Sequence, residues 1–502
     1  MFAALLALTM VVAHAPALNF RQELANPDEA QLLAGALTLR HDFAPWRSVD
    51  LSTAGPVSVL PLLIAPADFI SARWCAALCS AAAITVCFLG MTAVQDNLPA
   101  RIAAVPVAAF FVFMQSIELF QFSTEHMATV LLAVAVWIWL EATVGGKKPS
   151  AAGPAFALGL CLGAAIMAKL QSAPCAVWLA VATGSLLLLD ERTPWPRRLG
   201  VLFLQAVGCF AIPLGFVLLA TAHGVARDLL HSYGLNNMQY VTTISHEDAG
   251  GYQPALVWGL NYLLKPVFAL GLVCLVPALT FTPAERRTAF VTVGLLLSAI
   301  LAVILPGRGF GHYWFLVFGP LLLASGTVLV PAWRWLETRG PRLHRAAGLA
   351  LVPVLLALPV AHRLATSRDE ALAREFTNRP TVQAAGEKLR SLARPGDTLT
   401  VWGWRAELYV YSQLPQGTRE AHTQWLIQDI PQRDYYRRRF LADLARTQPR
   451  FIADAVGPRG FAFTARTTAG HEIFPAFTEL LAQRYDFIGE ISDVRLYVRH
   501  AD

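Results

Sequence analysis

Residues 199–221 read LGVLFLQAVGCFAIPLGFVLLAT, an uncharged run that is long enough for an α-helix to cross a lipid bilayer. Runs of this kind recur from Met1 to about Val360. Of the 502 residues, 55% are hydrophobic and only 15% are charged, and the mean hydropathy is +0.48. Soluble proteins carry about 25% charged residues. The sequence therefore predicts a polytopic α-helical membrane protein.

The apolar runs predict about eleven membrane-spanning helices. Their ranges are 2–18, 71–94, 102–118, 124–143, 152–168, 172–190, 199–221, 256–281, 288–305, 313–333 and 345–363. The first range ends in Ala13-His14-Ala15, which is similar to a signal-peptidase site. We expect this first helix to be kept as an anchor.

The basic residues indicate how the helices are oriented. The net charge of +6 and the pI near 9.0 come mainly from short loops between apolar runs, so we do not expect nucleic acid as a partner. Alternate loops are rich in lysine and arginine, which is typical of the cytoplasmic side. These residues are Arg101, Lys147, Lys148, Arg192, Arg197, Arg198, Arg286, Arg287, Arg334, Arg339, Arg342 and Arg345. The opposite short loops hold only Lys169, Arg227 and Arg308.

This asymmetry predicts a multi-pass protein of the inner (plasma) membrane. The transmembrane module comprises residues 1–363, with a first outer loop at 19–70. Residues 364–502 form a small C-terminal α/β domain on the outer, periplasmic side. Its expected elements are helices at 381–394 and 474–485, strands at 398–401 and 451–455, and a closing strand pair at 487–499.

Acidic residues occur at two places on the outward side. Asp28 and Glu29 begin a helical run in the first outer loop, and Glu125 opens the fourth predicted span. Acids in a first turn complement the helix dipole, so simple capping explains each of them when it is taken alone. Carboxylates at a membrane surface are nevertheless costly unless water, a cation or a substrate meets them.

Cationic residues occur on the same side. Lys169 lies between two spans with almost no loop, and residues 306–313 (PGRGFGHY) place Arg308 and His312 in a glycine-rich loop that suits a phosphate. Lys265 lies near the outward start of the eighth span. Snorkelling to lipid headgroups is the alternative explanation for the two lysines. The shared sidedness of the acids and the cations favours one functional site.

These residues resemble those of GT-C fold glycosyltransferases, in the group that includes protein O-mannosyltransferases and the lipid A aminoarabinose transferase. The resemblance runs from the first span to about Gly326. It rests on Asp28-Glu29, the Glu125 segment, the glycine-rich span ending in Lys169, and Arg308-x-x-x-His312-Tyr313. The chain departs from the group at Glu125, where many relatives have aspartate, and at Gly55-Pro56-Val57, which stands in place of Pro-Pro-Leu.

The resemblance implies an inverting transfer of a sugar from a polyprenyl-phosphate donor to a hydroxyl of a lipid, polysaccharide or protein. Asp28 is then expected to act as general base, with Glu29 and Glu125 positioning the loop or the acceptor. Lys169, Arg308, His312 and Lys265 would bind the donor phosphate. No cofactor is expected; Asp28 and Glu125 are able to bind a divalent metal, but the chemistry does not require one.

A membrane transporter or a flippase for a lipid-linked or polar substrate is the alternative. Many transporters contain inverted repeats and ionisable groups at mid-membrane, whereas this sequence shows no repeat and places its charges toward one face. A non-catalytic scaffold that presents the C-terminal domain to a partner is a second alternative. The sequence does not identify the sugar or the acceptor.

Overall fold

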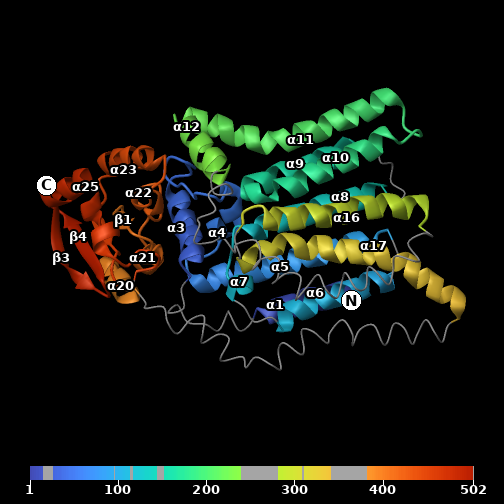
Figure 1. Cartoon of the computed structure of the whole chain (residues 1–502), viewed down its shortest axis with the longest axis horizontal. Coiled ribbons are helices and arrows are strands. Elements are labelled where there is room, and N and C mark those ends of the chain that lie inside the picture. The colour runs from blue at the N-terminus through green and yellow to red at the C-terminus, as the bar shows by residue number, and fades with distance from the viewer. Residues whose placement is uncertain are drawn as a thin grey trace.

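The computed structural model describes residues 1–14, 26–94, 97–113, 117–143, 152–238, 281–307, 310–340, 382–458 and 460–500. Long helices run side by side in a bundle, and a C-terminal part that contains a β-sheet lies beyond one end of that bundle (Figure 1). The bundle helices are α1 (Phe2–Ala13), α5 (Phe69–Thr92), α6 (Asn97–Phe113), α8 (Glu125–Thr143), α9 (Ala152–Ala168), α10 (Ala173–Leu188), α11 (Trp195–Ala222), α16 (Pro283–Ile304) and α17 (Phe315–Arg339).

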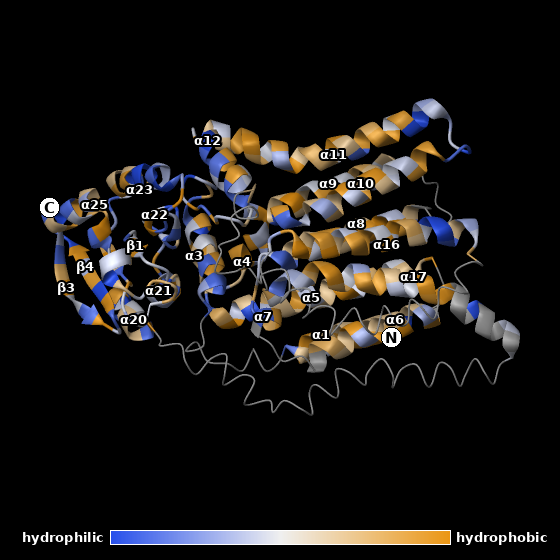
Figure 2. Ribbon diagram, viewed as in Figure 1, coloured by the Kyte–Doolittle hydropathy of each residue, from blue (hydrophilic) through white to orange (hydrophobic). Residues whose placement is uncertain are grey.

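Hydrophobic residues dominate the bundle, whereas hydrophilic residues are frequent at its ends and in the C-terminal part (Figure 2). Among the described residues, six helical segments are long and apolar enough to cross a membrane, by their length and composition. They correspond to the predicted spans at 71–94, 124–143, 172–190, 199–221, 288–305 and 313–333. The chain therefore has the character of a multi-pass membrane protein.

The predicted number of about eleven spans is matched only in part. The spans expected at 2–18, 102–118 and 152–168 correspond to the shorter apolar helices α1, α6 and α9. The two spans expected at 256–281 and 345–363 lie outside the described residues. Eleven spans thus stays a prediction.

Short polar side chains fix where several helices begin. The Asn26 side chain accepts hydrogen bonds at the start of α3 (Pro27–His41), and Asp68 does the same for α5. Thr282 and Glu285 form a reciprocal capping box at the start of α16. Each cap satisfies backbone N–H groups that have no partner inside the helix.

The segment between α3 and α5 forms a layer across one end of the bundle. It includes the 3₁₀ turn η2 (Pro56–Val59) and the short helix α4 (Leu60–Ile64). In Figure 1, α3 and α4 lie between the bundle and the C-terminal part. Further short elements are α7 (Ile117–Phe120), η3 (Leu170–Ser172), α12 (Ala226–Asp228), the π-helix η4 (Leu229–Leu235) and η7 (Gly311–Trp314).

A four-stranded mixed sheet organises the C-terminal part, with strand order β1-β2-β4-β3. β1 is parallel to β2, whereas β4 is antiparallel to both β2 and β3. The strands are β1 (Leu399–Trp402), β2 (Phe451–Asp454), β3 (Tyr485–Ile491) and β4 (Val494–Arg499). The helices are α20 (Gln383–Leu392), α21 (Glu407–Ser412), α22 (Gln424–Ile427), α23 (Arg433–Thr447), α24 (Arg466–Ala469) and α25 (Pro475–Arg484), with η8 (His471–Ile473) a 3₁₀ turn.

Alternate residues of the strands enter two different cores, as the period of a β-strand requires. Leu399 and Val401 pack with α20, α21 and the apolar residues of α3, whereas Trp402 and Ile452 pack with α23 and α25. The first of these cores also contains Val49 and Leu51 from the outer loop. The C-terminal part and the first outer loop therefore share one hydrophobic core.

Helices α9 and α11 touch through glycines. A Cβ atom added at Gly163 would lie 2.2 Å from the backbone oxygen of Cys209, and one added at Gly208 would lie 2.3 Å from that of Phe156. Small residues at such positions let helix backbones approach closely in membranes, where apolar side chains gain little from leaving lipid.

We predict that Gly163→Leu destabilises the bundle by about 1–3 kcal/mol, because the backbone oxygen of Cys209 cannot yield to the new side chain. Thermal unfolding of the purified protein in detergent measures the effect. Gly215→Leu on α11 is the matched control, because a Cβ at Gly215 meets nothing within 4 Å. Equal unfolding temperatures of the two variants would contradict the prediction.

Candidate active site

The first turn of α3 separates the two adjacent acids. Asn26 accepts from the Asp28 amide at 2.8 Å and from the Glu29 amide at 3.4 Å, and Pro27 occupies the first helical position. Consecutive helical residues point about 100° apart. Asp28 is accordingly exposed, whereas Glu29 is fully buried.

Glu29 forms a buried ion pair between α3 and α5. Its carboxylate lies 3.5 Å from the Arg73 guanidinium on α5, and neither side chain is exposed. The Phe122 amide donates to the same carboxylate at 2.9 Å. Burial raises the pKa of Glu29, and the Arg73 charge and the Phe122 hydrogen bond oppose that rise. Glu29 thus connects α3 to α5 and to the segment that precedes α8.

Glu125 and Lys169 form a second pair at the same end of the bundle. Glu125 begins α8 and is fully buried; its carboxylate lies 3.5 Å from Lys169 Nζ. Lys169 has extended backbone at the break between α9 and η3. Its ammonium group also lies 3.5 Å from the Thr53 hydroxyl and 5.8 Å from the centre of the Tyr313 ring. Lys169 is only 6% exposed, so it does not reach out to solvent.

His312 lies at the same end of the bundle as Asp28, Glu125 and Lys169. It lies in η7, at the start of α17, with its Nδ1 2.5 Å from a carboxylate oxygen of Glu118. The carboxylates of Asp28, Glu118 and Glu125 all interact electrostatically with the His312 imidazole. Asp28, Glu125, Lys169 and His312 therefore gather at one end of the bundle, where α3, α7 and the starts of α8 and α17 meet (Figure 1).

Two of the predicted residues cannot be placed. Arg308 and Lys265 lie outside the described residues, so their roles stay predictions. Conversely, sequence reasoning missed Glu118 and Arg73. Each is a charged residue in or beside an apolar run. Because such a residue requires a charged or polar partner, this position in the sequence could have indicated that both residues form buried contacts.

The described residues contain one group of acids and histidine with the spacing of a metal site: Asp454, His471 and Glu472 in the C-terminal part. The Arg466 guanidinium already lies there, 2.6 Å from Asp454 and 2.9 Å from Glu472. His471 Nδ1 also contacts Asp454 at 2.5 Å. Because Arg466 supplies the positive charge that these carboxylates need, this group is an ion-pair network.

We predict that Arg73→Met destabilises the protein by about 3–5 kcal/mol, because it leaves the buried Glu29 carboxylate without its counter-charge. The double variant Glu29→Gln/Arg73→Met should recover part of this loss, because it removes the unpaired charge as well. Thermal unfolding in detergent measures both. A double variant that is less stable than Arg73→Met would contradict the pairing.

Comparison with solved structures finds the same fold in ArnT from Cupriavidus metallidurans. ArnT bound to undecaprenyl phosphate matches with a TM-score of 0.54 and 14% identity, over 100% of this chain and 98% of ArnT. Apo ArnT matches with a TM-score of 0.53 and 13% identity, over 99% and 97%. No protein-family model and no curated protein sequence matches the chain. The structural match covers the whole chain, beyond the range to about Gly326 on which the resemblance of its motifs rested. The chain therefore has the GT-C fold of ArnT, as that resemblance predicted.

Proposed function

We propose that this protein transfers a sugar from a polyprenyl-phosphate donor to a hydroxyl acceptor on the outer face of the inner membrane. The observation that carries this proposal is the gathering of Asp28, Glu125, Lys169 and His312 at one end of an apolar bundle. The ArnT-like fold supports it, since one of the matching structures contains undecaprenyl phosphate.

The cations serve the donor. When the bond between the anomeric carbon and the phosphate oxygen breaks, the polyprenyl phosphate leaves with its negative charge. Lys169 and His312, together with Arg308 and Lys265, are proposed to offset that charge, so the leaving group needs no proton. The apolar bundle supplies surroundings in which the lipid chain is soluble.

The carboxylates serve the acceptor. Asp28 is proposed to take the proton of the attacking hydroxyl while its oxygen bonds to the anomeric carbon. Asp28 is exposed, so an acceptor reaches it, whereas Glu29 is buried against Arg73 and holds the helix in place. Glu125 holds Lys169 in position. A single displacement of this kind inverts the anomeric carbon.

We predict that Asp28→Asn lowers kcat about 10²- to 10⁴-fold, which is the usual contribution of a positioned general base. Transfer from radiolabelled polyprenyl-phosphate sugars in proteoliposomes measures it. Asp190→Asn is the matched control. Asp190 comes just after the C-terminus of α10, whereas Lys169 lies near the N-terminus of that helix, so Asp190 is far from the candidate site. Normal turnover by the Asp28 variant would remove Asp28 as the base, and lipid translocation without transfer by the wild type would favour a flippase.

We predict that Lys169→Met weakens binding of undecaprenyl phosphate about 10- to 100-fold, because it removes one charged contact to the phosphate. Stabilisation of the purified protein by added lipid measures the affinity. Lys388→Met, an exposed lysine on α20, is the control. The double variant Lys169→Met/Glu125→Gln separates lost binding from the effect of an unpaired Glu125. Unchanged affinity in both site variants would show that Lys169 does not contact the donor.

A further inference from the structure

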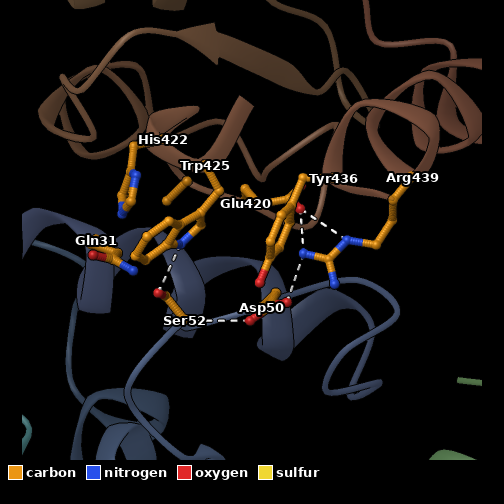
Figure 3. Close-up of a pocket in the computed structure, with 9 residues that line it drawn as sticks. Gln31, Asp50, Ser52, Glu420, His422, Trp425, Tyr436 and Arg439 are labelled. Atoms are coloured by element: carbon orange, nitrogen blue, oxygen red, sulfur yellow. Dashed lines mark hydrogen bonds and ion pairs between the residues drawn. The ribbon is translucent and has the colours of Figure 1, made fainter. Parts of the chain in front are cut away.

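Residues 50–55 of the outer loop contact both the C-terminal part and the candidate site. On the C-terminal side, the Arg439 guanidinium lies 2.8 Å from the Asp50 carboxylate, and the Trp425 indole N–H donates to the Ser52 hydroxyl at 3.0 Å. Figure 3 shows Trp425 and Arg439 reaching from the C-terminal part toward Ser52 and Asp50. The loop is thus held by two different kinds of polar contact.

The Asp50 contact is buried and reinforced. Asp50 and Arg439 are each less than 5% exposed, and Arg439 Nε also donates to Glu420 at 3.0 Å. The Asp50 amide donates to the Arg419 backbone oxygen at 2.7 Å. Burial opposes the charge of Arg439, but Glu420 and Asp50 raise its pKa well above the ordinary value, so it stays charged.

Ser52 has an unfavourable backbone conformation, with φ at +60°. A non-glycine residue adopts this conformation at a cost in free energy, and it persists where surrounding contacts over-determine it. The contacts here are the Trp425 indole, the Asn236 amide at 3.4 Å from the same hydroxyl, and Asp50, which accepts from the Ser52 amide at 2.9 Å. The C-terminal part therefore helps to fix the bend of the loop.

On the side of the bundle, the same loop contacts Lys169 and the residues that precede it. Ala54 forms an antiparallel β-bridge with Lys169, and the Gly55 amide donates a hydrogen bond to the backbone oxygen of Ala168 at 2.9 Å. A Cβ atom on Gly55 would lie 1.9 Å from the Met167 backbone oxygen, so the two backbones are in direct contact. The Thr53 hydroxyl is 3.5 Å from Lys169 Nζ.

We propose that Asp50 and Ser52 are positioning residues through which the C-terminal part sets the position of Lys169. Trp425 and Arg439 hold the loop at Ser52 and Asp50. Residues 53–55 then fix the Lys169 backbone and its ammonium group through direct contacts with both. The consequence for catalysis rests on the proposed function, because Lys169 is there a ligand of the donor phosphate. The C-terminal part then acts on the transfer without touching the donor.

Trp425→Phe tests the proposal, because it removes the indole N–H and keeps an aromatic ring. Its matched control is Trp404→Phe, since the Trp404 indole nitrogen has no hydrogen-bond partner among the described residues. Hydrogen exchange of the full-length protein in detergent should show faster exchange at residues 53–55 and 168–170 in Trp425→Phe. Exchange equal to that of Trp404→Phe would overturn the proposal, whatever the protein's activity.

Steady-state transfer tests the catalytic consequence. Trp425→Phe should lower kcat or raise the donor KM about tenfold or more, as small misplacements of positioning groups do, and leave the acceptor KM unchanged. Ser52→Ala should have at least the same effect, because it removes the acceptor of the Trp425 hydrogen bond and also the weaker contact to Asn236. The double variant should add little to Ser52→Ala, because the Trp425–Ser52 hydrogen bond is already lost. Donor kinetics equal to the control, or additive losses, would overturn the link to Lys169. A wild-type protein that transfers no sugar would refute the proposed function, while the exchange comparison would still decide whether the C-terminal part holds the loop.

Discussion

A charge that is removed from water is stable only when an opposite charge or a hydrogen-bond donor meets it. This constraint governs the end of the bundle that carries the candidate site. Glu29 is buried against Arg73 and Glu125 against Lys169, so four charged side chains that belong to different helices or helix junctions hold one another in place. The Glu29–Arg73 pair also attaches the first turn of α3 to α5 at this end of the bundle. Asp28, the neighbour of Glu29, is exposed at this end of the bundle.

The sequence predicted which residues lie near one another better than it predicted their ion-pair partners. In an apolar chain, hydropathy decides which residues lie at helix ends, and the positive-inside rule orders those ends. This was enough to place Asp28, Glu125, Lys169 and His312 together. It was not enough to pair Glu29 with Arg73, because that pairing depends on how α5 is rotated about its axis, which only packing determines. The roles of these residues stay predictions.

The C-terminal part was predicted less completely for a different reason. The expected elements at 381–394, 398–401 and 451–455 correspond to α20, β1 and β2. Helix α23 was missed because its arginines make it hydrophilic on average, although Tyr436, Phe440 and Leu444 recur at helical spacing and enter the core. Its Arg439 is the residue that reaches Asp50 in the outer loop. A contact between such distant parts of the chain leaves no trace in local sequence patterns.

The glycine contact between α9 and α11 has a consequence for how a lipid reaches the site. The backbones of these two helices touch, so a hydrocarbon chain cannot pass between them unless the helices separate and lose this contact. Lys169 directly follows α9, so its backbone is joined to a helix that cannot separate from α11 without losing this contact. On the proposed function, an incoming polyprenyl chain would therefore pass between helices other than α9 and α11.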